Sequence, residues 1–455
     1  MFIPDKKLFF RWWLIAALIY LIFSAVITWQ YGTDFLIPMG DDSAHHIKLA
    51  ENLIKYQTFS LDGLYSPEEP KQPLAPTNFL TPGYAFWLAL IYLVFNSFVP
   101  AIFIGALVFA VSVSLTYLLA QEITGNNKIA FWSALIFMIE PLSIYHSGLM
   151  FTEQLFVPIF LLAVYFFIRY IKTGNKNFVF SSLFIFSLSV LIRPIIFYLL
   201  PVLVLIVFFK ELKISIKHSI ILGTISFVLT YSIIGVWLVR NKTVLNTWQV
   251  SSNTGAILFG YHYEPLMRHL GLVPGNQKIL GGGRDIFSVE YNKILEKFVL
   301  GEITKHKVQY LEIRAAYAPL FFLSSGYNNI VSRFTGVPSL DKYFRGDLVS
   351  FFAKGDINGA LRIMFRAPKI AVLLIGFSFW FLITALAIIG FWRLLKTNKG
   401  TNFFAIIFIS ALIIYFNLVT TPLITARYRL PVNPFIFIFA VSGFYFLKEK
   451  IKQWV

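Results

Sequence analysis

The sequence contains no cysteine among its 455 residues, and only 13% of its side chains are charged. Without cysteine there can be no disulfide bond, thiolate nucleophile or cysteine-ligated metal. The chain also lacks a P-loop, a GxGxxG motif, a fixed-period repeat and a low-complexity tract. We therefore expect neither a soluble nucleotide site nor a repeat architecture.

Acidic residues are scarce, with 22 Asp and Glu against 39 Lys and Arg, which gives a net charge of +17. Many of the basic residues flank apolar segments of membrane length, so this charge indicates membrane topology and contact with anionic lipids, not nucleic acid. Hydrophobic residues make up 57% of the chain and include 50 Phe. This composition predicts an all-α polytopic membrane protein.

Apolar segments of suitable length predict about ten transmembrane helices. The first follows Lys6, Lys7 and Arg11 and has no small-residue cleavage site, so we expect a retained helix with a cytoplasmic N-terminus. The predicted spans cover residues 12–30, 100–120, 129–148, 153–171, 178–193, 195–209, 219–239, 368–392, 403–422 and 431–447.

The apolar run Pro82–Asn96 has 15 residues, which is short for a span. If it does not cross the membrane, the later short basic loops and the basic tail all lie inside the cell. If it crosses, they all lie outside, against the positive-inside rule. We therefore predict an interfacial or re-entrant helix in a multi-pass plasma membrane protein with both termini cytoplasmic.

The spans divide the chain into three parts. Residues 1–239 form a predicted transmembrane module that includes a first external loop, 31–99. Residues 240–367 are too long for a connector and too apolar for a disordered tail, so they predict an external, mainly helical cap. Residues 368–455 hold the C-terminal transmembrane helices.

A charged cluster stands outside the first span, in the sequence GDDSAHHIKLAENL. It contains Asp41, Asp42, His45 and His46. Apolar residues recur after Asp42 at helical spacing and predict a short amphipathic helix with Asp42 as its N-cap. Capping and complementing the helix dipole would be a purely structural role for Asp42.

Other unusual polar residues fall on the same predicted external face. They are Glu153 in GLMFTEQLF, Arg193 in LIRP, and Arg427, Tyr428 and Arg429 in ARYRLP. A carboxylate can take a proton from an acceptor hydroxyl and an arginine can hold a phosphate bidentately, so this set suits a reaction between an acidic lipid and a neutral acceptor. Structural roles stay open for each residue, as a first-turn glutamate, a snorkelling arginine or an aromatic-belt tyrosine.

The ordered set DSAHHIKLAENL, TPGYAFWLALIY, SGLMFTEQLFVPIFLLAVYFFIR, LIRP and ARYRLPVNP resembles a known family. It is similar to the bacterial relatives of protein O-mannosyltransferases and of the aminoarabinose transferase that modifies lipid A. These are C-type (GT-C) membrane glycosyltransferases that use polyprenyl-phosphate sugars. The resemblance covers the first 210 residues well, the last spans moderately and the 240–367 segment weakly.

The resemblance implies a catalytic carboxylate at Asp42, with Asp41 as the alternative register, and a second acidic position at Glu153. It also implies a donor-phosphate site and an acceptor or sugar pocket near these carboxylates. Many members have a basic residue before the PGY helix, where this chain has Leu80 and Thr81, so Lys71 or the external segment would supply that charge. The phosphate site would comprise Arg193, Arg427, Tyr428 and Lys71, and the pocket His45, His46 and Tyr84; many members have Tyr in place of His45.

The implied reaction is a single inverting displacement at the anomeric carbon, with Asp42 as general base. Because a phosphate monoester leaves readily, no carboxylic acid is needed to protonate it, which leaves Glu153 to orient the acceptor or the base. No cofactor is required, although the acidic pair beside His45 and His46 could bind a divalent metal ion. The expected partners are a polyprenyl-phosphate-linked sugar, an acceptor glycan, lipid or protein, and membrane lipids.

Two other classes of function remain open. A transporter or flippase for lipid-linked sugars would place its charged residues along a path through the membrane, in recognisable inverted halves. A lipid-linked oligosaccharide polymerase or ligase would present a large external loop with paired arginines as its main polar feature. The polar residues of this chain cluster instead at predicted external span ends, which favours the glycosyltransferase.

Overall fold

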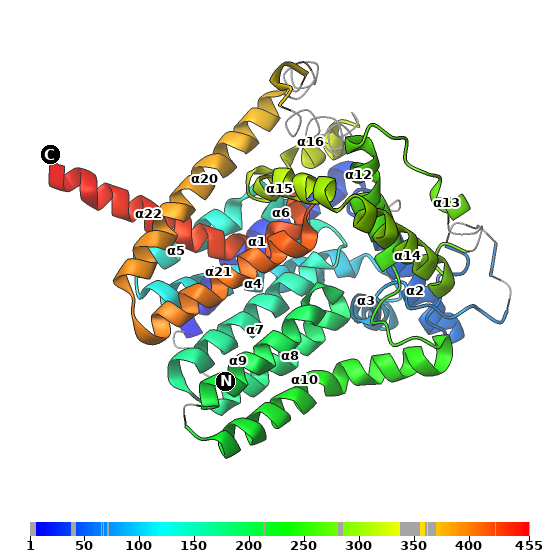
Figure 1. Cartoon of the computed structure of the whole chain (residues 1–455), viewed down its shortest axis with the longest axis horizontal. Coiled ribbons are helices and arrows are strands. Elements are labelled where there is room, and N and C mark those ends of the chain that lie inside the picture. Colours follow the sequence, from blue (N-terminus) through cyan, green and yellow to red (C-terminus); the bar gives the residue numbers. More distant parts are fainter. Residues whose placement is uncertain are drawn as a thin grey trace. The chain divides into compact units, whose positions relative to one another are not determined.

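The computed structural model describes residues 6–37, 42–64, 66, 68–70, 72–212, 214–280, 285–336, 355–359, 362, 370–423 and 425–454. Within these residues the chain forms helices and no strand, so the predicted all-α class is confirmed (Figure 1). The chain divides into two compact units. The first contains residues 1–139 and 143–251, and the second contains residues 140–142 and 252–455.

The first unit is a helical bundle in which α4 packs against α1, α5 and α7. Figure 1 shows α7, α8, α9 and α10 side by side. Side-chain caps fix two of the helix starts, since Asn175 accepts from Asn177 N–H before α8 and Ser215 accepts from His218 N–H before α10. The elements are α1 (Lys6–Tyr31), η1 (Thr33–Phe35), α2 (Asp42–Tyr56), α3 (Pro82–Phe95), α4 (Pro100–Thr124), α5 (Asn127–Ile139), α6 (Pro141–Gly148), α7 (Glu153–Thr173), α8 (Lys176–Ile192), η2 (Pro194–Leu199), α9 (Leu200–Leu212) and α10 (Ile216–Leu245).

The second unit combines short helices with long apolar ones. The most extensive helix packing in this unit is between α20 and α22. Their backbones approach so closely that a Cβ at Gly390 would lie 1.8 Å from the Phe439 carbonyl oxygen. Small residues permit such crossings between membrane helices. The elements are α11 (Thr254–Leu258), the π-helical turn η3 (Phe259–Tyr263), α12 (Glu264–His269), α13 (Gln277–Leu280), α14 (Val289–Lys305), α15 (Lys307–Leu323), α16 (Tyr327–Thr335), α20 (Ile370–Thr397), α21 (Gly400–Thr420), η5 (Ala426–Val432) and α22 (Asn433–Trp454).

The segment between α10 and α20 has its own apolar core. Side chains of η3, α12, α14 and α15 meet there, and nine of them are buried. The described part of the 240–367 segment is therefore helical and packed, while its external position stays a prediction. The buried residues are Phe259, Tyr263, Leu266, Met267, Tyr291, Leu295, Val299, Ile313 and Tyr317.

Eight helices among the described residues are long and apolar enough to cross a membrane. The pair α5 and α6 adds a ninth candidate, bent by 57° at Glu140, and α8 is a shorter apolar helix of 17 residues. These ten segments correspond one by one to the predicted spans, so an architecture of about ten transmembrane helices is confirmed. The helix α3 has 14 residues, and its interfacial or re-entrant position stays a prediction.

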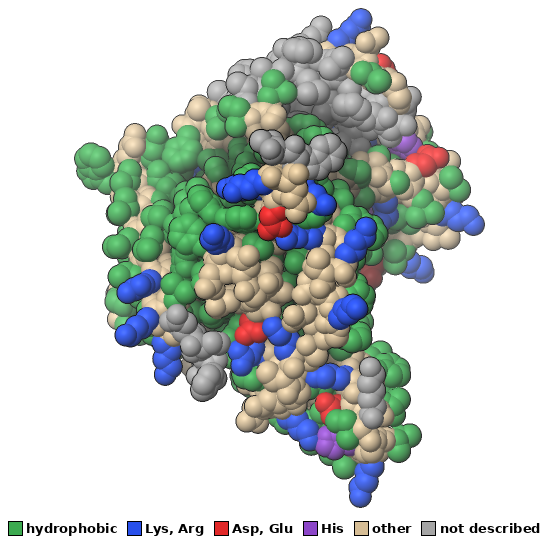
Figure 2. Space-filling model, turned by 90° about the vertical axis from the view of Figure 1, so that its left-hand side faces the viewer, with side chains coloured by type: hydrophobic (Ala, Val, Ile, Leu, Met, Phe, Trp, Pro, Cys, Tyr) green, Lys and Arg blue, Asp and Glu red, His purple; other side chains and the backbone are tan. Residues whose placement is uncertain are grey.

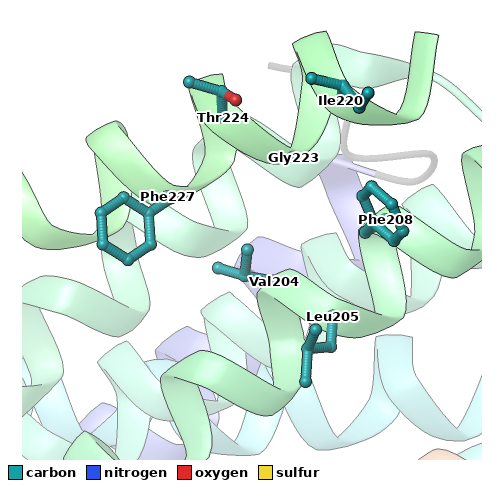
Figure 3. A pocket seen from close by; sticks show the side chains of 7 residues that line it. All are labelled: Val204, Leu205, Phe208, Ile220, Gly223, Thr224 and Phe227. Atoms are coloured by element: carbon teal, nitrogen blue, oxygen red, sulfur yellow. The ribbon is translucent and has the colours of Figure 1, made fainter. Parts of the chain in front are cut away.

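The outer surface is largely apolar. Figure 2 shows hydrophobic side chains over much of one face, with Lys and Arg side chains between them. In the first unit, an open groove of about 280 Å³ runs between α9 and α10 (Figure 3). Its lining is apolar except for Thr224, which suits a hydrocarbon chain and not a polar substrate; it comprises Val204, Leu205, Phe208, Ile220, Gly223, Thr224 and Phe227.

Candidate functional site

The sequence predicts Asp42 as the N-cap of α2, and the structure places it one position later, as the first residue of the helix. Asp42 lies in the first turn and is half-buried, where a carboxylate complements the helix dipole. The next residue, Ser43, is buried and its hydroxyl donates to the Met150 carbonyl at 2.6 Å. The start of α2 is thus attached to the loop that leads into α7.

Glu153 and Arg193, two predicted site residues 40 positions apart, form an ion pair in the first unit. The Arg193 Nη1 lies 2.5 Å from Glu153 Oε1, and the side chains are 12% and 0% exposed. Glu153 is the first residue of α7, and Arg193 is the residue between α8 and η2. Its extended backbone (φ −142°, ψ 118°) follows from Pro194, because the residue before a proline avoids the helical region.

The helix α3 brings the TPGY sequence against the LIRP sequence. The Thr81 hydroxyl donates to the Ile192 carbonyl at 3.0 Å instead of capping α3. A Cβ at Gly83 would lie 2.7 Å from the Leu191 carbonyl oxygen, so only glycine permits this approach. Sequence analysis missed both roles; a glycine in an otherwise apolar helix was the available signal for close packing.

A buried polar group lies beside the ion pair. The rings of His46 and Tyr84 meet edge to face, with centroids 5.1 Å apart. The Tyr84 hydroxyl donates to Gln154 Oε1 at 3.4 Å, and Gln154 Nε2 donates to the Ser147 carbonyl at 2.6 Å. Sequence analysis did not single out Gln154, although it directly follows Glu153.

Two further features complete this side of the unit. Gly105 on α4 leaves room for Gln154, since a Cβ there would lie 2.3 Å from Gln154 Oε1. The ring of His45 stacks on Phe79, with centroids 6.1 Å apart. The first unit thus brings together Glu153 with Arg193, and His46 with Tyr84, whose hydroxyl bonds to Gln154.

The remaining predicted residues have different settings. Arg427 and Tyr428 lie on η5 in the second unit, and both are half-buried, whereas the neighbouring Arg429 is fully buried. Asp41 and Lys71 lie outside the described residues. Among the residues that are described, no three His, Asp or Glu side chains could hold a metal ion; this leaves out Asp41, so metal dependence stays a prediction.

Comparisons with known proteins agree with this architecture. Residues 76–237 match the family model described as dolichyl-phosphate-mannose-protein mannosyltransferase, and this segment contains Tyr84, Glu153 and Arg193. No curated protein sequence matches the chain significantly. The first unit therefore carries the sequence likeness to this family.

Two solved structures are similar to the whole chain. The archaeal oligosaccharyltransferase AglB from Archaeoglobus fulgidus, in complex with an inhibitory peptide and a dolichol-phosphate, matches with a TM-score of 0.51 at 14% identity over 99% of this chain. The match covers 51% of AglB, so the chain spans about half the length of that enzyme. ArnT from Cupriavidus metallidurans, bound to undecaprenyl phosphate, matches with a TM-score of 0.36 at 12% identity over 94% of this chain and 76% of ArnT.

The resemblance seen in the sequence is thereby confirmed. The chain is a multi-pass membrane protein with the fold of the C-type (GT-C) glycosyltransferases.

Proposed function

We propose that the protein is a membrane glycosyltransferase that moves a sugar from a polyprenyl-phosphate donor to an acceptor hydroxyl on the extracytoplasmic face of the cell membrane. The observation that carries this proposal is the site of the first unit, where the Asp42 carboxylate begins α2 and the buried Glu153–Arg193 pair begins α7. The family match of residues 76–237 and the dolichol-phosphate bound to AglB support a lipid-phosphate donor.

In the proposed reaction, Asp42 removes the proton from the acceptor hydroxyl. The acceptor oxygen forms the new bond to the anomeric carbon as the bond from that carbon to the phosphate oxygen breaks, with inversion. Polyprenyl phosphate leaves with the bonding electron pair, and Asp42 keeps the proton until it passes to solvent. Arg193 stabilises the charge on the departing phosphate; Arg427, Tyr428 and Lys71 are further candidates for this role from the sequence.

The ion pair refines the role of Glu153. A guanidinium has five N–H donors in one plane, so Arg193 can bond to Glu153 and still present donors to a phosphate. Glu153 then fixes the orientation of Arg193. The side chains of His45, His46 and Tyr84 form the proposed acceptor or sugar pocket. Gln154 holds the Tyr84 hydroxyl in this arrangement.

The direct test uses purified protein with a radiolabelled polyprenyl-phosphate sugar and candidate acceptors. The proposal predicts acceptor-dependent release of polyprenyl phosphate and a product heavier by one sugar. A flippase would leave the donor intact, and a polymerase or ligase would transfer a whole oligosaccharide, so either result would contradict it. Mass spectrometry of surface glycans from a deletion strain would identify the sugar and the acceptor.

A further inference from the structure

Arg429 is fully buried in the second unit and donates hydrogen bonds to two other elements, α15 and α22. Its Nη1 donates to the Phe321 and Phe322 carbonyls at 2.5 and 2.8 Å, and its Nε donates to Asn433 Oδ1 at 2.9 Å. The two carbonyls belong to the last turn of α15, where backbone acceptors lack partners within the helix. The positive charge of Arg429 also complements that end of the helix dipole.

An aromatic side chain covers the guanidinium. The Arg429 Cζ lies 3.5 Å from the ring centroid of Trp380 on α20, within cation–π distance. Trp380 is itself fully buried and stacks on Phe437 of α22 at 5.4 Å. Arg429 therefore links η5 to α15, α20 and α22.

A carboxylate balances the charge of this cluster. Glu140 is 2% exposed, interacts electrostatically with Arg429, and is hydrogen-bonded to the Tyr327 hydroxyl. Burial, followed by the charge of Glu140, raises the pKa of Tyr327, so the phenol stays neutral and donates to the carboxylate. Glu140 lies at the 57° break between α5 and α6. We call Arg429, Glu140, Tyr327 and Trp380 the anchor cluster.

Such a cluster is costly to bury in a membrane protein. Buried charges of opposite sign often stabilise a fold less than apolar residues of the same size would, and charged residues within membrane segments usually serve a function. The two residues before Arg429 are the half-buried Arg427 and Tyr428. Because η5 is a 3₁₀-helix with three residues per turn, residues 427, 428 and 429 point in directions about 120° apart. Fixing Arg429 therefore fixes the directions of the other two.

We propose that Arg429 and Glu140 are positioning residues: the anchor cluster holds η5 so that Arg427 and Tyr428 present a rigid binding surface to the phosphate of the lipid donor. This inference rests on the proposed function. In this proposal Arg427 and Tyr428 contact the phosphate. Arg429, from the same ARYRLP sequence, does not.

The test measures binding of undecaprenyl phosphate to the purified full-length protein, together with thermal unfolding in detergent. Arg429→Gln should unfold at a lower temperature, because it leaves Glu140 as an uncompensated buried charge. The double variant Glu140→Gln/Arg429→Gln should regain much of that stability. It should still bind undecaprenyl phosphate about 10- to 100-fold more weakly than the wild type, since the fork that holds η5 is lost.

Three more variants complete the experiment. Arg427→Gln should weaken binding to a similar degree without lowering the unfolding temperature, and adding Arg429→Gln to it should cost little further binding. Tyr327→Phe, which removes only one hydroxyl, should weaken binding about 2- to 10-fold. Arg393→Gln breaks an exposed pair with Glu449 and serves as the control that binds normally.

The outcomes separate the two proposals. The double variant Glu140→Gln/Arg429→Gln could bind normally, or the binding losses of Arg427→Gln and Arg429→Gln could be additive. Either result would mean that the anchor cluster only stabilises the fold, and the proposed function would be unaffected. Normal binding by Arg427→Gln, or no binding by the wild type, would overturn the donor site on η5 and this inference with it.

Discussion

Arg193 Nη1 lies 2.5 Å from Glu153 Oε1, and the pair is almost completely buried. Each residue is therefore also a structural partner of the other. Removing one member of a buried ion pair typically costs about 3–5 kcal/mol, because the remaining charge is left without compensation. A loss of activity in a single variant could thus reflect both a less stable fold and weaker binding of the proposed donor phosphate.

Our first prediction separates these effects. Arg193→Gln should lower the unfolding temperature in detergent, and Glu153→Gln/Arg193→Gln should restore most of it. Donor use should remain about 10- to 100-fold impaired in the double variant, since the charge-assisted bond to phosphate is absent. Arg193→Lys should recover only part, because a point charge cannot replace the fork. If the double variant regains normal donor kinetics, Arg193 has a structural role alone.

The second prediction concerns the contact between α3 and α8. Gly83→Ala would place a Cβ 2.7 Å from the Leu191 carbonyl oxygen and force the two helices apart. We expect a loss of about 1–3 kcal/mol in unfolding free energy, with reduced transfer, because overpacking strains both backbones. Gly235→Ala is the matched control: its Cβ meets nothing within 4 Å, so it should leave stability unchanged or raise it. Equal unfolding temperatures for the two variants would contradict this packing.

A third prediction follows from His262, which lies outside the membrane spans. Burial, with a smaller contribution from the Arg314 charge, lowers the pKa of His262 to about 4. Its Nδ1 shares a hydrogen bond of 2.6 Å with the Tyr310 hydroxyl, and Arg314 Nη1 donates to the same hydroxyl at 3.3 Å. Below about pH 6.5, the pKa of a histidine in the unfolded chain, the unfolded chain binds a proton that the folded chain does not. The free energy of unfolding therefore decreases as the pH decreases.

Between pH 7 and pH 5 the loss should be on the order of 2 kcal/mol. Hydrogen exchange in residues 254–323 measures it, by comparing the wild type with His262→Gln at each pH. The glutamine can still accept from Tyr310 but does not titrate, so the pH-dependent difference in protection should disappear. Identical pH dependence in both proteins would show that His262 is not responsible.

The fourth prediction concerns membrane orientation. Single cysteines replace exposed residues of this cysteine-free chain at Glu68, Lys176, Lys297 and Lys399. With α3 interfacial and the termini inside, an impermeant thiol reagent should label positions 68 and 297 from outside, and 176 and 399 only after the cells are opened. External labelling at position 176 would mean that α3 crosses the membrane, and the proposed shared face would fail.

Hydropathy predicted the apolar helices, α3 among them, because the length and periodicity of apolar segments are local properties. The same holds for α2, which begins at Asp42 as its amphipathic pattern predicts. The Glu153–Arg193 bond could not be predicted in this way. Its residues are 40 positions apart, and only the packing of α7 against α8 brings them together.

The burial of individual polar side chains could not be predicted from the sequence either. The arginines of ARYRLP look alike in the sequence, yet Arg429 is fully buried while Arg427 is half-buried. Likewise, Gln154 and Ser43 donate to the backbone carbonyls of Ile102 and Met150, which are distant in the sequence, and no side-chain pattern records such bonds.

The assignment of Asp42 as general base is the centre of this account. Asp42→Asn keeps the size of the side chain and removes only a first-turn charge, which contributes about 0.3–1 kcal/mol to a helix, so it should leave α2 folded. Asp41→Asn, the alternative register, is the matched comparison and should be milder.

The deciding measurement is single-turnover sugar transfer by Asp42→Asn at saturating donor, with thermal unfolding in detergent recorded alongside. The account predicts a normally folded protein that binds undecaprenyl phosphate but transfers about 10²- to 10⁴-fold more slowly, because the proton acceptor is gone. Transfer at close to the wild-type rate by the folded variant would contradict it.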